Sequence, residues 1–324
     1  MNISLKLLAG AAFALCCALV QAQQWPTKPV TMVNPFAPGG GVDAFGRPLS
    51  VVLSKTLGQQ FIVENLAGAG GTIGAANAAR RAGDGYNFFL GAVHHTIAES
   101  LYTKLPYSLE RDFVPITVLA YVPNVVVVHP KHAARLKSIK DLIAYAKAKP
   151  GELNAANSGP GSASHLAAEM FTSMAGVKII HVPFKGTGGA MPDLVAGRVH
   201  LYINPMLAMI SQVQAGRIRL IAVTSPKRVN SMPDVPTVAE SGVPGYEATS
   251  WYMLLLPSKT PAAIVSKLHA ETVKALHSKD IADNLAKGGS EPVGDSPKEA
   301  LEFLKAEIAR WGKVIREAKV TVQG

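Results

Sequence analysis

The chain has 324 residues, 48% of them hydrophobic, and a formal net charge of +10 at pH 7. A chain of this length can bury a sizeable core, and a prior of roughly 150 residues per domain predicts two domains. The basic residues are scattered, in runs no longer than pairs such as Arg80-Arg81. This pattern argues against a nucleic-acid partner, although a basic surface can steer anionic ligands.

Residues 1–22 have the pattern of a cleavable secretory signal peptide. Lys6 is the only charge before the apolar residues 7–20, and Val20-Gln21-Ala22 fits the small-residue rule for cleavage. Both cysteines, Cys16 and Cys17, lie inside this segment, so the mature chain is expected to have no disulfide and no thiolate. No later stretch approaches the ~18 consecutive apolar residues of a membrane-spanning helix. We therefore expect an exported, soluble protein.

Residues 30–57 have the pattern of a strand, a glycine loop and a helix. Residues 30–33 are apolar and rich in β-branched side chains, whereas residues 35–41 contain too much proline and glycine for a regular element. From residue 42 to residue 57 apolar side chains recur at threes and fours, which is typical of one helix face, and Gly58 ends the pattern. Pro48 lies inside the pattern without an N–H, so we expect the helix to begin near Gly46 and to leave Asp43 in the loop.

The rest of the chain continues this alternation. Expected strands are residues 61–63, 87–92, 153–156, 178–182, 199–203, 219–223 and 250–256, and expected helices include residues 72–81, 163–174 and 206–214. The long β-branched run at residues 119–129 can pass from one domain into the other. The final helix should pack on a sheet through the stripe Leu301, Leu304, Ile308, Trp311 and Ile315. This order predicts an α/β fold with mostly parallel sheets.

Four glycine-rich loops follow strands, at residues 39–41, 68–71, 159–161 and 186–189. Such a loop before a helix directs unpaired backbone N–H groups at a small anion, and the helix N-terminus adds a partial positive charge. None of the loops matches the phosphate-binding P-loop, and Gly68, Gly70 and Gly74 miss the dinucleotide fingerprint by one residue. We therefore expect an anion site without a nucleotide or another cofactor.

Catalysis and metal binding have weak support. A serine hydrolase would use Ser162 or Ser164 with His165, but no G-x-S-x-G elbow is present, and these hydroxyls are expected to satisfy helix N-terminal amides. The adjacent His94 and His95 would point in different directions, and no further ligands stand at metal spacing. No acid, base or nucleophile stands out, so the sequence favours holding a small carboxylate without converting it.

Two further side chains are candidates for the pocket. His95 lies between a strand and a helix, where it can line a pocket. Lys185 precedes a glycine loop and can pair with a carboxylate.

Several motifs in order resemble the Bug family, the periplasmic solute receptors of tripartite tricarboxylate transporters. They cover essentially all of the chain after residue 22. The matching segments are Trp25-Pro26-Thr27-Lys28-Pro29-Val30, Pro35-Phe36-Ala37-Pro38-Gly39-Gly40-Gly41-Val42-Asp43, Val63-Glu64-Asn65, Gly68-Ala69-Gly70-Gly71, Ser158-Gly159-Pro160-Gly161-Ser162-Ala163-Ser164-His165-Leu166, Pro183-Phe184-Lys185-Gly186-Thr187 and Asp234-Val235-Pro236-Thr237.

The resemblance implies a type II periplasmic-binding-protein fold, in which two α/β lobes close on a carboxylated ligand. Residues 23–123 and 248–324 would form the first lobe, and residues 124–247 the second. Carried over by position, the ligand contacts would be Phe36, Ala37, Pro38, Gly39, Gly40 and Asp43 from the first lobe, and Ser158, Ser162, Ser164, His165, Gly186 and Thr187 from the second. Asn204-Pro205-Met206, where relatives often carry Asp and Phe, and His94-His95 depart from the family pattern, which implies that Asn204 and His95 alter selectivity.

The function implied by the resemblance is that of a monomeric periplasmic receptor, not an enzyme. It would capture a small organic carboxylate and hand it to the membrane permease subunits of the transporter. The alternative is a sensory receptor of the same fold that presents its loaded form to a membrane sensor kinase. The ligand stays open among aromatic acids, dicarboxylates, citrate-like acids and amino acids.

Overall fold

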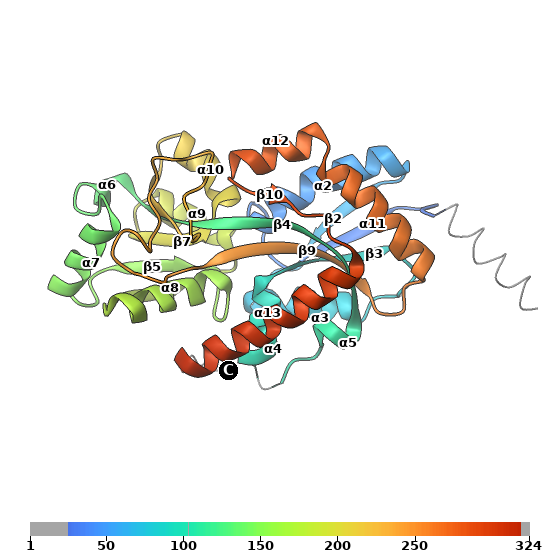
Figure 1. The fold of residues 1–324 in the computed structure, drawn as a ribbon, viewed down its shortest axis with the longest axis horizontal. Coiled ribbons are helices and arrows are strands. Elements are labelled where there is room, and N and C mark those ends of the chain that lie inside the picture. Colours follow the sequence, from blue (N-terminus) through green and yellow to red (C-terminus); the bar gives the residue numbers. More distant parts are fainter. Residues whose placement is uncertain (1–24, 103, 319–324) are drawn as a thin grey trace, which may run out of the picture.

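The computed structural model describes residues 25–102 and 104–318, and the expected signal peptide lies outside these ranges. Strands and helices alternate through the described chain (Figure 1). The strands are β1 Val30–Asn34, β2 Phe61–Asn65, β3 Asn87–Ala92, β4 Phe113–Val128, β5 Asn154–Asn157, β6 Ile180–Pro183, β7 Leu201–Pro205, β8 Arg219–Val223, β9 Thr249–Pro257 and β10 Glu291–Pro292. The helices are α2 Gly41–Leu57, the 3-10 turn η1 Ala69–Gly71, α3 Thr72–Ala79, α4 Val93–Leu101, α5 Leu109–Asp112, α6 Pro130–Ala133, α7 Ile139–Ala148, α8 Ala163–Ala175, α9 Thr187–Val195, α10 Met206–Gln214, α11 Ala262–Leu276, α12 Lys279–Lys287 and α13 Pro297–Ala318.

One sheet runs through two groups of elements, which we call the first lobe (residues 25–123 and 248–318) and the second lobe (residues 124–247). The strand order is β2-β1-β3-β9-β4-β7-β5-β6, and β8 and β10 also pair with β4. In the first lobe β1 is parallel to β2 and β3, and in the second β5 is parallel to β6 and β7. The neighbours of β4 and β9 are all antiparallel to them. The parallel sheets expected from the sequence are therefore joined by antiparallel strands.

Strand β4 carries the sheet from the first lobe into the second, and β9 pairs with its first-lobe half. The strand expected at residues 119–129 begins earlier, at Phe113. It pairs with β9 as far as Pro123 and then with β7 from Asn124 to Val128. Pairing on both sides of this junction fixes the path of the chain from one lobe to the other.

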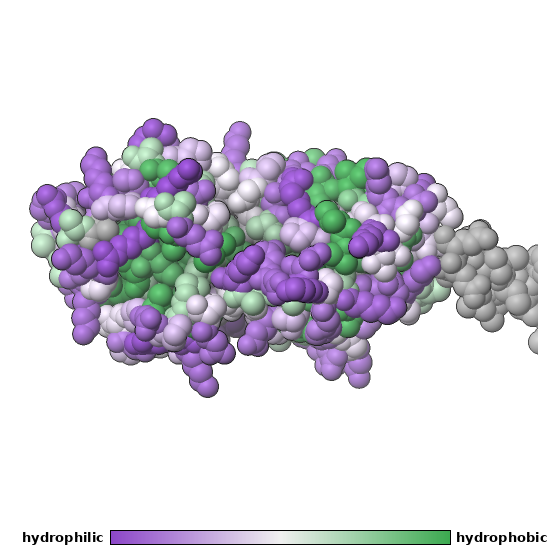
Figure 2. Space-filling view, turned by 90° about the horizontal axis from the view of Figure 1, so that it is seen from above, coloured by the Kyte–Doolittle hydropathy of each residue, from purple (hydrophilic) through white to green (hydrophobic). Residues whose placement is uncertain are grey.

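Helices cover both faces of the sheet in each lobe (Figure 1). In the first lobe α2, α11 and α12 pack on one face, and α3, α4 and α13 on the other. In the second lobe α7 and α8 lie opposite α9 and α10. The apolar stripe of α13 packs as expected on the sheet, where Leu304 and Trp311 are buried, and it also contacts α4. Hydrophilic side chains cover most of the face seen in Figure 2, with apolar residues in recesses between them. None of the helices in the described part of the chain has the length and apolar character to cross a membrane.

Helix α2 begins at Gly41, so the expected start near Gly46 is wrong, and Asp43 lies in the first turn. The expectation failed because it treated Pro48 as incompatible with a preceding helical turn. Pro48 has no N–H to donate to the carbonyl of Ala44, four residues earlier. Instead, the side-chain Nδ2 of Asn284 in α12 donates to that carbonyl at 3.3 Å. A partner from a distant helix thus allows the proline inside α2.

Replacing Asn284 with alanine should lower the free energy of unfolding by about 1 kcal/mol, because the Ala44 carbonyl loses its donor. In a Pro48→Ala background the same change should cost much less, since residue 48 then has an N–H for that carbonyl. Urea unfolding of the four chains gives this coupling directly. Equal losses in both backgrounds would contradict the explanation.

Candidate functional site

Helix N-termini from both lobes converge at the carboxyl ends of the parallel strands. Helix α2 follows β1 and α4 follows β3 in the first lobe, while α8 follows β5 and α9 follows β6 in the second. In α/β sheets, ligands bind at the carboxyl ends of strands, and helix N-termini favour negative charge there. The fold therefore builds an anion-compatible cleft between the lobes.

The two lobes touch along both sides of this cleft, so the conformation is closed. On one side a Cβ added to Gly188 would lie 2.0 Å from the carbonyl oxygen of Pro38. On the other side a Cβ on Gly70 would lie 2.8 Å from the carbonyl oxygen of Pro160, and the hydroxyl of Tyr102 donates to that same oxygen at 3.3 Å. Gly70 also has a φ of +63°, which L side chains rarely adopt. Two of the closest approaches between the lobes are thus made by glycine main chain, with the Tyr102 hydroxyl beside one of them.

A cavity of about 210 Å³ lies between these contacts. At ~30 Å³ per water molecule, it holds roughly seven water volumes, which suits a small organic molecule. Lys185 is the one charged side chain among the described residues that line it, and it is exposed. The lining residues are Phe36, Ala67, Gly68, Ala69, Gly70, Gly71, Ser158, Gly159, Pro160, Pro183, Phe184, Lys185 and Gly186.

Asp43 holds the first-lobe loop from inside. Its Oδ1 accepts hydrogen bonds from the side-chain amides of Asn34 and Asn65, both at 3.1 Å. Its Oδ2 accepts from the Gly39 N–H at 3.0 Å and from Arg47 Nε at 2.8 Å. The side chain of Asp43 is 6% exposed. These four bonds use the carboxylate to fix the loop shape, so its predicted contact with a ligand has no geometric support of its own.

The charge of Asp43 persists at neutral pH. Burial raises its pKa, but hydrogen bonds from Arg47, Gly39 and Asn65 outweigh burial, so the pKa lies below its ordinary value. A carboxyl group with a lowered folded-state pKa stabilises the protein fully above its unfolded pKa of about 3.9. This stabilisation is lost only as the pH falls through the folded-state pKa.

Hydroxyl groups shape the second-lobe loop at residues 158–165. Ser162 Oγ accepts from the His165 N–H at 3.3 Å as the N-cap of α8, and Ser164 Oγ accepts from the Ser158 N–H at 2.9 Å. His165 Nδ1 accepts from the Gly161 N–H at 3.2 Å. Neither ring nitrogen of His165 bonds to a serine hydroxyl among the described residues. Ser162 therefore caps α8 as expected, whereas Ser164 binds a main-chain amide of the preceding loop, and this arrangement does not match a hydrolase.

Four side chains form a buried polar cluster below the second-lobe loops. The hydroxyl of Tyr202 lies 2.6 Å from Ser158 Oγ and 3.3 Å from Thr187 Oγ1. Thr187 Oγ1 donates to Asn204 Oδ1 at 3.1 Å. Asn204 is 1% exposed, and its Nδ2 has no partner among the described residues. A buried amide donor beside the first residue of α9 is therefore left unused.

Tyr252 of β9 supplies a second unused donor near the N-terminus of α2. A Cβ on Gly41 would lie 2.1 Å from the Tyr252 hydroxyl and 3.2 Å from Pro205 Cβ, so this hydroxyl lies where the two lobes meet. Tyr252 is 1% exposed, and its hydroxyl has no hydrogen-bond partner in the described chain. Gly40 lies against Thr187 in the same region. The unused donors of Asn204 and Tyr252 thus accompany the N-termini of α9 and α2.

The His94-His95 pair lies behind the first-lobe loop rather than on the cavity wall. The ring of Phe36 is 4.6 Å from that of His94 and 6.1 Å from that of His95. Burial lowers the pKa of His94 to about 3 and that of His95 to about 4, so both are neutral at pH 7. His95 Nδ1 accepts from the Ala92 N–H at 3.0 Å at the start of α4. The pair contributes shape and no positive charge.

His165, Glu169 and His181 place three potential metal-ligand atoms within 4.8 Å of one another. Glu169 Oε1 lies 3.3 Å from His165 Nε2 and 3.4 Å from His181 Nε2. Because His165 Nδ1 accepts from Gly161, the ring proton sits on Nε2 and points at Glu169. A ligating histidine would need a free lone pair there and an acceptor for its other N–H, and His181 Nδ1 has no partner among the described residues. The cluster fits a hydrogen-bonded carboxylate better than a metal ion.

The predicted site residues take different positions around the cleft. Phe36, Ser158, Lys185 and Gly186 line the cavity. Ala37, Pro38, Gly40 and Thr187 lie at the contact between the lobes, and Gly39, Asp43, Ser162, Ser164 and His165 fix the loops. Sequence reasoning missed Tyr202 and Tyr252, which resemble ordinary core residues in strands. It also left residues 67–71 out of the site, although their glycines were visible.

Comparisons with known proteins agree with this architecture. A family model described as the tripartite tricarboxylate transporter family receptor, TctC, matches residues 46–320. Protein BugT of Bordetella pertussis is 38% identical over 308 residues, which cover 94% of this chain and 94% of BugT.

Two solved structures are also similar over nearly their whole length. R. palustris Rpa4515 with adipate is 40% identical with a TM-score of 0.88, covering 92% of this chain and 99% of that one. MatC from Rhodopseudomonas palustris with bound malate is 32% identical with a TM-score of 0.84, and the match covers 90% of this chain and 100% of MatC. The expected periplasmic-binding-protein fold is thereby confirmed. The chain belongs to the Bug family of tripartite tricarboxylate transporter receptors.

Proposed function

We propose that the protein is a periplasmic receptor that captures a small organic carboxylate by lobe closure and delivers it to the membrane permease subunits of a tripartite tricarboxylate transporter. The family is one of solute-binding receptors, and two similar proteins were solved with adipate and malate. In this proposal the chain is exported to the periplasm, acts as a monomer and converts no substrate.

The unused donors beside the N-termini of α9 and α2 carry this proposal. Asn204 Nδ2 and the Tyr252 hydroxyl are buried without partners in the described chain. Leaving a buried donor without a hydrogen-bond partner costs about 1–3 kcal/mol, so the closed conformation is disfavoured when no ligand accepts from these two donors. A carboxylate accepts several hydrogen bonds, directly or through a bridging water, and is favoured by the N-termini of α2 and α9. The donors and the helix N-termini therefore match one ligand chemistry.

The volume and charge of the cavity narrow the ligand class. A cavity of about 210 Å³ is below the ~300–1,000 Å³ typical of drug-sized ligands, so a compact acid fits best. Lys185 at its mouth can pair with a second carboxylate. We therefore place short dicarboxylates such as malate and adipate first among the candidates.

A thermal-shift screen against monocarboxylates, dicarboxylates, tricarboxylates and amino acids tests the proposal. A ligand at 100 times its dissociation constant should stabilise the protein by about 2.7 kcal/mol, which is a rise of several degrees in Tm. We expect short dicarboxylates to give the largest shifts, and the matching diols, which lack the charge, to give none. Equal shifts from acids and diols, or no shift from any acid in the panel, would contradict the proposal.

A further inference from the structure

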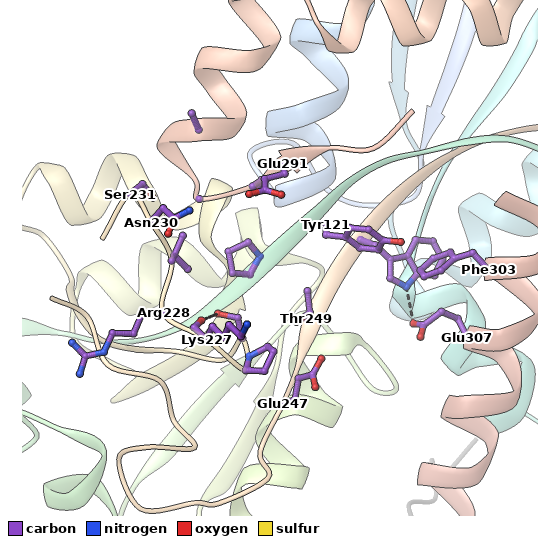
Figure 3. Close-up of a pocket in the computed structure, with 18 of the residues that line it drawn as sticks. Tyr121, Lys227, Arg228, Asn230, Ser231, Glu247, Thr249, Glu291, Phe303 and Glu307 are labelled. Atoms are coloured by element: carbon purple, nitrogen blue, oxygen red, sulfur yellow. Dashed lines mark hydrogen bonds between the residues drawn. The ribbon is translucent and has the colours of Figure 1, made fainter. Parts of the chain in front are cut away.

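A second large cavity lies against β4 and β9 near the junction of the lobes. Its volume is about 700 Å³. Figure 3 shows Tyr121, Phe303 and Glu307 on one side of it, Lys227 and Arg228 on the other, and Glu291 and Glu247 at opposite edges. Residues of both lobes line this space, which we call the hinge cavity. A volume of this size lies within the usual range for small-molecule sites.

The strand register places an aromatic and acidic row on one face of the sheet. Glu291 of β10 is opposite Tyr121 of β4, and Tyr121 is opposite Trp251 of β9. Directly opposite residues of antiparallel strands project to the same face, with Cβ atoms about 4.5–5.5 Å apart. The row ends at Phe303 of α13, whose ring is 5.6 Å from that of Tyr121 and 5.4 Å from that of Trp251. The floor of the hinge cavity is therefore aromatic, with a carboxylate beside it.

Several charged groups around the cavity are already paired. Arg310 lies 3.1 Å from Glu307, and the same buried Glu307 accepts from the indole of Trp251 at 2.8 Å. Arg228 donates to Glu240 at 2.7 Å. These pairs neutralise both arginines and leave no charge from Glu307 for a ligand.

Among the lining charges that have no ion-pair partner in the described chain, carboxylates outnumber cations by two to one. Glu247 and Glu291 are exposed and have no ion-pair partner among the described residues. Lys227 is the one lining cation that is likewise exposed and without an ion-pair partner in that part of the chain. Tyr121 is 41% exposed, so its ring is accessible to a ligand. Ser290 also lines the cavity, is 5% exposed, and has a hydroxyl without a partner in the described chain. An aromatic ring with two carboxylates and a spare hydroxyl matches a cation that carries N–H donors.

We propose that the hinge cavity is a second binding site, for an amphipathic organic ammonium compound. The ammonium group lies beside the ring of Tyr121 and the carboxylate of Glu291, its cross-strand neighbour, and the apolar part packs on Phe303. Glu247, at the opposite edge, adds negative potential from a distance. Because residues of both lobes line the cavity, a bound ligand contacts both lobes in their closed conformation.

Calorimetric titration with phenethylammonium, and with 2-phenylethanol as its neutral counterpart, tests the assignment. The cation should bind at least fivefold more tightly than the alcohol, and 0.5 M NaCl should reduce the difference, because salt screens the exposed carboxylates. Glu291→Gln and Tyr121→Ala should each weaken cation binding about fivefold. Glu302→Gln, an exposed glutamate of α13 outside the cavity, is the matched control and should bind as the parent chain does.

Three results would overturn the proposal. Equal binding of the ammonium compound and the alcohol would remove the role of charge, and unchanged binding in both Glu291→Gln and Tyr121→Ala would place the cation elsewhere. If 3-phenylpropionate binds more tightly than the ammonium compound and Lys227→Ala abolishes that binding, the site prefers an anion rather than a cation. Thermal melts of each variant confirm that it is folded before titration.

Discussion

Replacing Gly188 with alanine should reduce the affinity for the cleft ligand at least 100-fold, while the ligand-free protein stays folded. The added Cβ would lie 2.0 Å from the carbonyl oxygen of Pro38, where real contacts are not shorter than about 3.0 Å. The lobes then cannot reach the closed contact, and a penalty of about 2.8 kcal/mol on that state gives the 100-fold loss. Gly188 lies in α9, where alanine is favoured over glycine by about 1 kcal/mol.

The matched control is Gly189→Ala, in the same helix turn. A Cβ at Gly189 has its nearest neighbour, Phe184 Cβ, at 3.9 Å, which is an ordinary contact. Isothermal titration with the acid that gives the largest thermal shift measures both affinities, and small-angle scattering reports closure. Parent-like affinity in the Gly188→Ala chain would show that the contact between Gly188 and Pro38 is not needed for binding.

Replacing Tyr252 with phenylalanine should weaken ligand binding at least tenfold without lowering the stability of the ligand-free protein. The change removes one buried hydroxyl that has no partner in the described chain and leaves the ring in place. Losing a donor to a charged ligand costs about 1.5–3 kcal/mol, whereas losing an unpaired buried hydroxyl costs folding nothing. Calorimetry and urea unfolding measure the two quantities separately.

Tyr107→Phe provides the comparison, because the Tyr107 hydroxyl is also buried without a partner among the described residues. Tyr107 belongs to the first-lobe core with Phe113 and Leu304, away from the cleft. This change should leave ligand affinity unaltered. If both substitutions reduce affinity equally, the Tyr252 hydroxyl has no specific role in binding.

The sequence predicted β1 and the loop after it because the signals for both are local. Proline and glycine at residues 35–41 end β1, and the apolar period of α2 follows directly. The predicted start of α2 is wrong because the donor that replaces the missing Pro48 N–H belongs to Asn284, 240 positions after the Ala44 carbonyl that it binds. A local pattern holds no information about such a partner.

The candidate site was predicted only as far as its loops. Glycines after strands, together with the family resemblance, indicated where the main chain would approach a ligand. Tyr252 and Tyr202 lie in buried strands, where a tyrosine that serves a ligand has the same pattern as one that fills a core. Conversely, Asp43 is predicted to contact the ligand, but its carboxylate accepts four hydrogen bonds from groups in its own lobe. That the predicted residues touch a ligand directly stays a prediction.

The closest contacts that close the cleft involve glycine main chain, whereas the unused donors are side chains. Gly188 meets the Pro38 carbonyl and Gly70 meets the Pro160 carbonyl, while Asn204 and Tyr252 lie beside the N-termini of α9 and α2. Substitutions at these two side chains should therefore change ligand preference while leaving the contacts that close the lobes intact.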